Sequence, residues 1–383
     1  MANNNENKVL NVPHLRFPEF SGEWKEEQLD SIATLSKGIG ISKEQLSEDG
    51  EPCILYGELY TKYKSEIIKQ VESKTDINGS KLKRSKANDV IIPCSGETAV
   101  DIATARCVPF DNILFGGGLN VISLHQYDGA FMSYQLNGKR KYDIARVAQG
   151  VSIVHLYGEH LKAIKTYNPT LPEQQKIAKL LSLLDDRIDT QNKIIEKLQS
   201  LIKGIAQHCI KESTSGNTYV KLGDICQITT GKLDANAQVD NGIYPFFTCA
   251  EQPFKIDSFA FDTEALLISG NGANLGYINY YKGKFNAYQR TYVLDLFSEN
   301  IQYIKWALKV LLPKRIAIEK SSSNTPYIVL STLTDLRLPI PCKSKQSFIA
   351  NLMQSLERKL SNQIAQYDSY NYLKQYLLRQ MFI

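Results

Sequence analysis

Several hallmarks of enzymes and of membrane or secreted proteins are missing from this 383-residue sequence. It has no stretch near the roughly 18 unbroken apolar residues of a membrane span, and residues 1–8 lack the apolar core of a signal peptide. Its seven cysteines stand singly, with neither a C-x-x-C pair nor a Cys/His cluster at metal-binding spacing. Walker A and kinase-type glycine-rich loops are also absent. We therefore expect a cytoplasmic protein with reduced thiols, no membrane partner and no bound metal.

What the sequence does contain is an internal duplication. The opening WKEEQLDSIATLSKG from Trp24 resembles YVKLGDICQITTGK from Tyr219. An apolar segment then ends in Ser-Gly in both halves, VIIPCSG up to Gly96 and ALLISG up to Gly270. GVSIVHL in the first half matches TPYIVLS in the second, and QQKIAKLLSLLDDRI matches KQSFIANLMQSLERK. The chain therefore holds two copies of one unit, and the first copy carries about 20 extra residues near its start.

Each copy predicts a mixed domain followed by a long helix. Short runs of Val, Ile, Tyr and Phe alternate with Gly, Asn and Pro, as in DNGIYP and NGANLGYINYYKGK, which is typical of many short strands and turns. A helix is predicted over 300–312, where four apolar residues share one face. We therefore predict an α+β protein of two pseudo-symmetric, strand-rich domains joined by two long antiparallel coiled-coil helices. The predicted boundaries are a tail at 1–19, a first domain at 20–169, a helix at 170–212, a second domain at 213–341 and a helix at 342–383.

The first long helix is predicted to begin with a capping box, with Thr170 as N-cap and Glu173 as the third residue. Pro172 is tolerated in the first turn of such a helix. Apolar residues then follow at alternating spacings of four and three, the heptad pattern of a coiled coil. About 38 residues of helix span roughly 57 Å. The predicted pairing positions are Ile177, Leu181, Leu184, Ile188, Gln191, Ile195 and Leu198.

The second helix repeats this pattern 172 residues later, with pairing positions Ile349, Met353, Leu356, Leu360 and Gln363. Because both patterns lie in one chain, pairing within the chain is favoured over a helical hairpin inside a core or a homodimer stalk. A two-fold relation between the copies makes the helices antiparallel and places Gln191 opposite Gln363. Two inverted domains on a fixed spacer suit DNA, because the two strands of DNA are themselves related by a two-fold axis.

Positive charge is concentrated in one segment. Between Lys62 and Lys86 lie eight basic and three acidic residues, so this segment alone has the same net charge, +5, as the whole chain. Either a solvated surface loop or a phosphate-binding surface would account for this charge.

Three segments resemble the specificity subunits of type I restriction–modification systems. They are FPEFSGEWKEEQLDSIATLSKG, KANDVIIPCSGETA and above all NPTLPEQQKIAKLLSLLDDRIDTQNKIIEKLQSLIKGI. The resemblance covers nearly the whole chain. The second copy keeps Gln346, Ile349 and Ala350 but lacks the preceding Leu-Pro-Glu, so the cap of its helix differs from the family pattern.

This resemblance implies a DNA-binding subunit without catalytic residues. Two target recognition domains would each read one half of a bipartite double-stranded DNA target. The helices would set the spacing between the halves and bind two modification subunits, through which restriction subunits join. The chain itself would bind no cofactor, since the partner subunits of this family use S-adenosylmethionine, ATP and Mg.

The alternatives are a specificity subunit of a related methyltransferase or endonuclease system, a methyltransferase with its own recognition domain, and a structural scaffold. A methyltransferase needs motifs that this sequence only approaches. Phe115-GGGL has Leu119 where F-x-G-x-G ends in glycine, and Asn168-PTL lacks the aromatic residue that stacks a flipped base. A scaffold would leave the two strand-rich domains without a role.

DNA contacts are predicted from side-chain chemistry. A Glu accepts from cytosine N4, Gln pairs with adenine, Arg pairs with guanine, and Lys binds phosphate. The alternative for each residue is an ordinary turn or surface position. The predicted contacts of the first domain are Tyr60, Tyr63, Lys81, Lys83, Arg84, Lys86, Ser95, Glu97 and Thr98. Those of the second domain are Asn271, Asn274, Gln289, Arg290, Lys314, Arg315 and Lys320.

Overall fold

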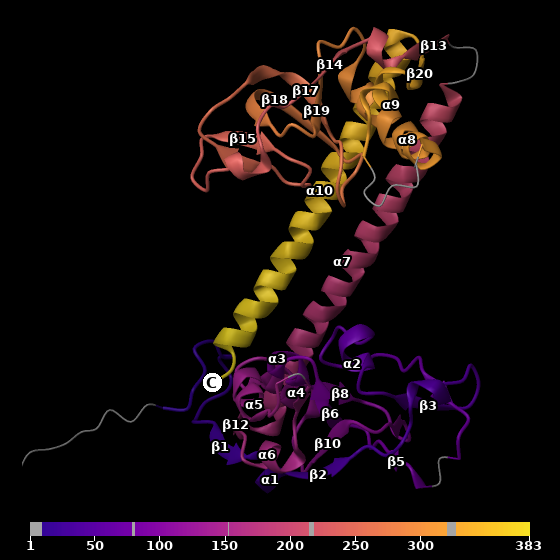
Figure 1. Ribbon diagram of the computed structural model, residues 1–383. Helices are drawn as coiled ribbons and strands as arrows, with labels where there is room; N and C mark the ends of the chain where they lie inside the picture. Colours follow the sequence, from indigo (N-terminus) through magenta and orange to yellow (C-terminus); the bar gives the residue numbers. More distant parts are fainter. Residues whose placement is uncertain (1–9, 79–80, 152, 214–217, 320–326) are drawn as a thin grey trace, which may run out of the picture. The chain divides into compact units, whose positions relative to one another are not determined.

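The protein divides into two compact units in a computed structural model that describes residues 10–78, 81–151, 153–213, 218–319 and 327–383 (Figure 1). The first unit holds residues 1–192 and 366–383, and the second holds residues 193–365. Each unit contains one mixed domain and part of both long helices, α7 (Leu171–Glu212) and α10 (Lys343–Gln380). The predicted fold, two strand-rich domains with two long helices, is confirmed.

The first unit is built from short strands and helices, shown in indigo to magenta in Figure 1. Before α7 these are β1 (Lys25–Gln28), α1 (Leu29–Ile32), β2 (Ala33–Lys37), η1 (Lys43–Gln45), β3 (Glu51–Ile54), α2 (Glu58–Thr61), β4 (Lys74–Thr75), β5 (Lys83–Arg84), β6 (Asp89–Pro93), β7 (Ser95–Gly96), α3 (Ala99–Ile102), β8 (Arg106–Val108), β9 (Leu114–Phe115), β10 (Leu119–Leu124), α4 (Gly129–Asn137), α5 (Lys141–Val147), β11 (Val154–His155), α6 (Gly158–Lys162) and β12 (Lys165–Asn168). Its main sheets have the orders β2-β10-β6-β8 and β4-β3-β9-β5, and β1 pairs with β12.

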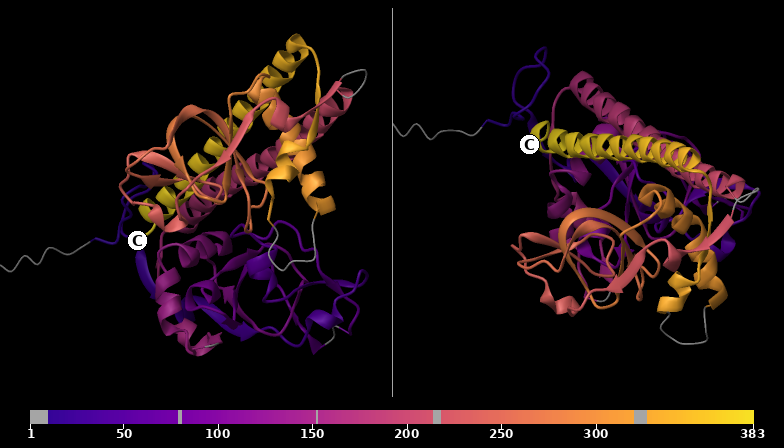
Figure 2. Two further views of the ribbon diagram at one scale, coloured as in Figure 1. Left: turned by 45° about the horizontal axis from the view of Figure 1, so that its top comes forward. Right: turned by 90° about the horizontal axis from the view of Figure 1, so that it is seen from above.

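The second unit has one larger sheet, which curves in both views of Figure 2. Its elements are β13 (Thr218–Lys221), η3 (Leu222–Asp224), β14 (Gln227–Thr230), η4 (Ala235–Ala237), β15 (Tyr244–Phe247), β16 (Phe254–Ile256), β17 (Phe261–Ser269), β18 (Ile278–Ala287), β19 (Thr291–Asp295), α8 (Ile301–Glu319), α9 (Leu330–Thr334) and β20 (Arg337–Ile340). The sheet order is β14-β19-β17-β18-β15-β16, and β13 pairs with β20 as β1 pairs with β12.

One glutamine in the first turn of α7 joins this helix to α4 and to the preceding loop. The Oε1 of Gln174 accepts from the backbone N–H of Asp128 at 2.9 Å, and its Nε2 donates to the carbonyl of Pro169 at 2.9 Å. Asp128 in turn caps α4, because its Oδ1 accepts from the N–H of Phe131. Gln174 is 1% exposed, so it fixes the entry into the long helix from inside the fold.

The second copy repeats this arrangement 172 residues later. The Oε1 of Gln346 accepts from the N–H of Asn300 at 3.1 Å, and its Nε2 donates to the carbonyl of Pro341 at 2.8 Å. Asn300 caps α8 by accepting from the N–H of Tyr303. The internal duplication is therefore preserved at the level of single hydrogen bonds.

Replacing Gln174 with leucine is expected to lower the free energy of unfolding of the first unit by about 2–4 kcal/mol. Two backbone groups would lose their partners while the side-chain volume stays similar, and each unpaired buried group costs about 1–3 kcal/mol. Urea unfolding measures the change. The matched control is Gln175→Leu at the exposed neighbouring position, where we expect a change within about 0.5 kcal/mol. Equal stability of the two variants would contradict a structural role for Gln174.

The predicted capping box at the start of α7 needs a correction. The N–H groups of Glu173 and Gln174 both donate to the carbonyl of Thr170, but the Glu173 carboxylate turns away from the helix end. It accepts from Nε and Nη2 of Arg16, both at 2.8 Å, and from Nε1 of Trp24. This carboxylate is 1% exposed, and a buried charge needs a charged partner, which Arg16 supplies. The ion pair therefore connects the segment before β1 to α7.

The predicted helix over 300–312 is also longer in the structure, since α8 continues through Pro313 to Glu319. Pro313 removes only one backbone donor from the helix. Buried side chains before it, such as Leu308 and Leu312, and the half-buried Ile316 beyond it pack on the same core. This continuous apolar face holds the helix together across the proline.

The heptad positions pack between α7 and α10 in each unit. In the first unit Ile177, Leu181 and Leu184 form one cluster with Leu377 and Met381 of α10, and Ile188 lies at its edge. In the second unit Leu198 and Ile202 cluster with Ile349 and Met353, beside Leu356 and Leu360. The start of α7 thus meets the end of α10 in the first unit, which is the antiparallel order. Of the remaining pairing positions, Ile195 and Gln191 are buried and Gln363 is half-buried. That Gln191 and Gln363 face each other stays a prediction.

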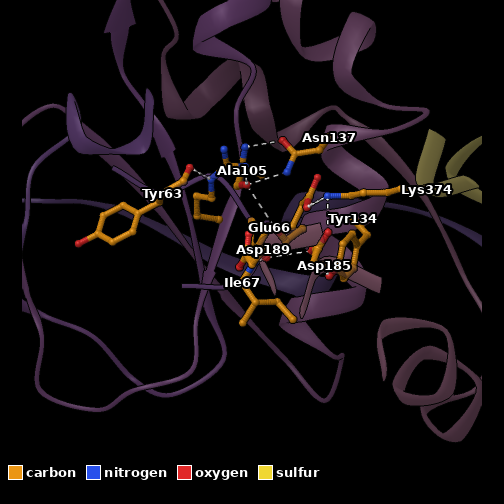
Figure 3. A network of polar contacts seen from close by, with 12 residues as sticks. Tyr63, Glu66, Ile67, Ala105, Tyr134, Asn137, Asp185, Asp189 and Lys374 are labelled. Carbon is orange, nitrogen blue, oxygen red and sulfur yellow. Dashed lines mark hydrogen bonds and ion pairs between the residues drawn. The ribbon is translucent and has the colours of Figure 1, made fainter. Parts of the chain in front are cut away.

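A charged network attaches α10 to the first unit (Figure 3). The ammonium of Lys374 lies 2.5 Å from Oε2 of Glu66 and 2.7 Å from Oδ1 of Asp185 on α7. Oδ2 of Asp185 also accepts from the hydroxyls of Tyr134 and Ser65. Burial opposes the charge of Lys374, but the two carboxylates outweigh it and raise the pKa of the ammonium above its ordinary value. Three parts of the chain are therefore held together by complementary charge.

Candidate nucleic-acid interface

Four predicted contact residues of the second domain converge at one end of its sheet. Strand β17 ends at Ser269, and the N–H of Gly270 donates to the carbonyl of Arg290 at 2.8 Å. A Cβ on Gly270 would lie 2.5 Å from that carbonyl, so only glycine allows the two turns to approach so closely. The turn after β17 and the turn between β18 and β19 therefore lie side by side.

A third turn joins them through Cys249. Its Sγ lies 3.0 Å from Oδ1 of Asn271, and its carbonyl accepts from Nδ2 of Asn274 at 3.1 Å. Asn271 and Asn274 are half-buried, whereas Gln289 and Arg290 are exposed. This arrangement presents amide and guanidinium groups together on one edge, and those groups are the ones that pair with adenine and guanine.

The basic residues of α8 lie near this edge. Ile316 packs so close to Gly276 that a Cβ there would come within 2.6 Å of its Cδ1, which places the last part of α8 against the turn after β17. Lys314 in that part of the helix is exposed, and Arg315 is half-buried. Lys320 lies outside the described residues.

In the first domain, Tyr60, Ser95 and Glu97 line one hollow together with Tyr56, Asp101 and Ile153. The hydroxyl of Tyr60 donates to the carbonyl of Ser95 at 3.3 Å. Burial, and then the nearby Asp101 carboxylate, raise the pKa of Tyr60 above its usual range, so this hydroxyl stays protonated. Because the residues that line the hollow come from separate loops, the sequence alone could not predict that they lie together.

Thr98 has a structural role beside this hollow. Its Oγ1 accepts from the N–H of Asp101 at 3.1 Å and donates to Oδ2 of Asp101 at 2.6 Å, so Thr98 caps α3. The candidate base-reading side chain of this turn is therefore Glu97.

Two predicted contacts of the first domain already have partners within the protein. Tyr63 is 8% exposed and packs in the core beneath the sheet, because its ring joins the apolar cluster that contains Ile54 and Leu59. Arg84 forms a two-point ion pair with Glu51, at 2.6 and 3.0 Å, which raises the pKa of Arg84 and lowers that of Glu51. Its charge is already neutralised within the protein.

Other charges of the basic segment are also paired, while three predicted lysines stay on the surface. Lys62 pairs with Glu58 at 2.7 Å, and Lys69 pairs with Asp186 and Asp189 of α7. Lys81 and Lys86 are exposed and Lys83 is half-buried. The net charge of the segment therefore overstates the charge that it offers to phosphate.

Sequence reasoning missed Tyr56, Asp101, Ile153 and Cys249. Tyr56 precedes Tyr60 by four residues on the way into α2, a spacing that places two side chains on one side of a helix. That spacing is the sequence feature that could have predicted Tyr56 as a neighbour of Tyr60. Asp101 is bonded to Thr98, three residues away, whereas Ile153 and Cys249 join the turns through contacts that are distant in sequence.

The family model for the type I restriction modification DNA specificity domain matches this chain twice, at residues 21–200 and 214–367. The chain belongs to this family. The two matches correspond to the two copies of the duplicated unit, each with part of the long helix that follows.

Individual relatives are similar over different lengths. The specificity subunit of the type I restriction enzyme EcoDI from Escherichia coli is 44% identical over 137 residues, which is 36% of this chain and 30% of that protein. A type I specificity subunit from Mycoplasma genitalium is 21% identical, with 94% of each chain covered. The chain thus matches less than a third of the first relative but nearly all of the second.

Two solved structures share the fold. The crystal structure of a type I restriction-modification S subunit from M. genitalium has a TM-score of 0.67 at 20% identity, covering 97% of this chain and 99% of the other. A chain from a structure on complex assembly and conformational transition of the type I R-M system has a TM-score of 0.57 at 16% identity, covering 94% and 97%.

Two features are absent from the described residues. They contain no group of three or more His, Cys, Asp or Glu side chains placed to hold a metal ion. Within the same parts of the chain, no helix combines the length and the apolar character needed to cross a membrane.

The three surface lysines give a prediction for DNA binding by this family member. Changing Lys81, Lys83 and Lys86 together to glutamine should make the slope of log affinity against log salt less negative by about 2–3. Each phosphate contact that is lost reduces the number of counterions released on binding by about 0.9. Arg84→Gln is the matched control and should leave the slope unchanged, since Arg84 is paired with Glu51. Filter binding or fluorescence anisotropy at several salt concentrations measures the slope. An unchanged slope for the triple variant would remove these lysines from the interface.

Proposed function

We propose that this chain is the DNA-recognition subunit of a type I restriction–modification complex and that each of its domains reads one half of a bipartite target. The observation that carries the proposal is the repeated Ser-Gly turn. In both domains this turn follows a buried strand and packs against the same later segment, where Gly96 pairs with Val154 and Gly270 accepts from Ile328. The side chains around the two turns differ, as two different half-sites require.

The long helices supply the spacer and the docking surface in this proposal. Their pairing faces are mostly apolar and are buried or half-buried, which favours a single register. Their other faces carry exposed apolar side chains, including Leu183 and Leu201 of α7 and Phe348 and Tyr372 of α10. Exposed apolar side chains along a helix suit contact with another protein, and modification subunits are the partners we propose.

The chemistry of the complex belongs to its other subunits in this account. The chain provides double-stranded DNA binding, without catalytic residues and without a cofactor of its own. S-adenosylmethionine binds to two modification subunits, and ATP and Mg serve restriction subunits that join through them. The domain limits proposed for this division are 20–169 and 213–341, with the helices at 170–212 and 342–383.

Methyl transfer from labelled S-adenosylmethionine to plasmid DNA tests this function. The purified chain alone should transfer no methyl group, and the chain with its modification subunit should methylate adenine at one bipartite sequence. The modification subunit alone is the control for recognition. Activity that stays with the chain after denaturing repurification, or sequence-specific methylation without the chain, would contradict the proposal.

A further inference from the structure

We infer that the hollow of the first domain reads an exocyclic amino group, the donor that cytosine presents at N4 and adenine at N6 in the major groove. This inference rests on the proposed function and names the base chemistry that this domain selects. The hollow is lined by Tyr56, Tyr60, Ser95, Glu97, Asp101 and Ile153.

The two tyrosines form fixed walls. Tyr60 is held by its hydrogen bond to Ser95, and a Cβ on Gly96 would come within 3.0 Å of the Tyr60 hydroxyl. Gly118 has φ of +84°, and a Cβ there would lie 2.7 Å from the ring of Tyr56. Both tyrosines are about 40% exposed, so their rings present flat apolar surfaces to the hollow. Gly96 and Gly118 lie against these rings, where a larger residue would not fit.

Glu97 is the carboxylate of this site that has no partner among the described residues. The Asp101 carboxylate is bonded to Thr98, and the carbonyl of Ser95 accepts from Tyr60. Glu97 is exposed, and the parts of the chain that the structure describes show no hydrogen-bond or ion-pair partner for its carboxylate. The negative charge repels phosphate and leaves a strong acceptor for a donor group.

The position of the hollow favours a base as the occupant. Glu97 follows the Ser95–Gly96 turn, just as Asn271 follows the Ser269–Gly270 turn in the second domain. Ile153, which lines the hollow, is 60% exposed, and Val151 is 97% exposed. Apolar side chains of this kind contact thymine methyl groups or base steps. One acidic and one amide-rich turn at equivalent places would make the two half-sites different.

The alternative ligand for this hollow is a cationic side chain of a partner protein, because tyrosine rings and a carboxylate also bind cations. The equivalence with the second domain argues against it, and the experiment separates the two cases. If the hollow bound a partner, loss of Glu97 would weaken assembly with the modification subunit and leave base selection intact.

The test uses the complex of the full chain with its modification subunit and duplexes that carry its methylated target. Adenine is replaced by purine, and cytosine by 2-pyrimidinone, at one first-half position at a time, so that single amino groups are removed. We expect one position where the wild-type complex loses roughly 10- to 100-fold in affinity. In Glu97→Ala the same base change should alter affinity by about twofold or less, because the acceptor is gone.

Two further variants complete the design. Glu97→Gln keeps the size of the side chain and should show an intermediate loss, and Glu48→Ala removes another exposed carboxylate of the same domain and should behave like wild type. The inference is overturned if Glu97→Ala keeps the wild-type discrimination, if selection changes in the second half-site, or if only assembly weakens. A wild-type complex that binds all sequences equally would instead refute the proposed function.

Discussion

Replacing Lys374 with methionine should lower the free energy of unfolding of the first unit by about 3–5 kcal/mol, the usual cost of removing one partner from a buried ion pair. The side chain of Lys374 is 16% exposed, and those of Glu66 and Asp185 are 10% and 4% exposed. Methionine fills a similar volume but leaves both carboxylates without the ammonium that contacts them, and the buried Arg106 guanidinium acts on them without a direct ion pair. Most of the loss should therefore arise from those unpaired charges.

The pH dependence has a defined sign. The folded pKa of Lys374 is raised, so its contribution to stability is complete below the ordinary lysine pKa of about 10.4 and is lost as pH rises through the folded value. The stability difference between wild type and variant should stay constant from neutral pH to about pH 10 and shrink above it.

Urea unfolding in a Trp306→Phe background measures the Lys374 effect, because Trp24 then reports on the first unit alone. Arg379→Met removes an exposed charge from the same helix and is the matched control. The triple variant Lys374→Met, Glu66→Gln, Asp185→Asn should recover part of the loss. A Lys374→Met protein as stable as Arg379→Met would contradict the network as drawn in Figure 3.

Phe382→Ala should cost the first unit about 3–5 kcal/mol, the range for truncating a fully buried aromatic side chain. Phe382 is 1% exposed, and its ring lies 5.2 Å from that of Phe131 and 6.4 Å from that of Trp24. These rings pack with Met381 and Leu377 on the first turns of α7, so the end of α10 is part of this core.

Thermal unfolding and the emission of Trp24 both report on this change. Tyr372→Ala, in α10 at a position that is 74% exposed, is the control and should change stability by about 0.5 kcal/mol or less. Loss of stability should be similar at pH 7 and pH 10, unlike an effect that depends on charge. If the two variants unfold alike, residues near the end of α10 do not belong to the core of the first unit.

The features that could be predicted from sequence are those set by local spacing. The heptad positions from Ile177 to Leu198 form an apolar face on any helix of this length, so their burial follows from the pattern alone. The duplication likewise located the Ser-Gly turns, because a repeated motif marks equivalent places in two copies. Short strands were predicted as a class from their turn residues.

Features that depend on contacts distant in sequence could not be predicted. The side chain of Arg84 has the chemistry of a phosphate ligand, but its ion-pair partner Glu51, which is 33 residues away, could not be identified from the sequence. Glu173 fitted a capping box by spacing, yet Arg16 and Trp24 take its carboxylate. Tyr63 has the chemistry of a surface contact but completes an apolar cluster. In each case the tertiary environment decides which of two chemically reasonable partners a side chain meets.

The central claim is that the two domains read DNA independently, and a domain exchange tests it most directly. Residues 20–169 are replaced by the first domain of another specificity subunit, chosen to keep the equivalents of Trp24 and Asp128, which contact α7 side chains. The hybrid is expressed with the modification subunit, and methylated adenines are mapped by sequencing the genome of the host. We expect a new first half-site beside an unchanged second half-site and spacer. A target that changes in both halves, or in neither, would contradict the account.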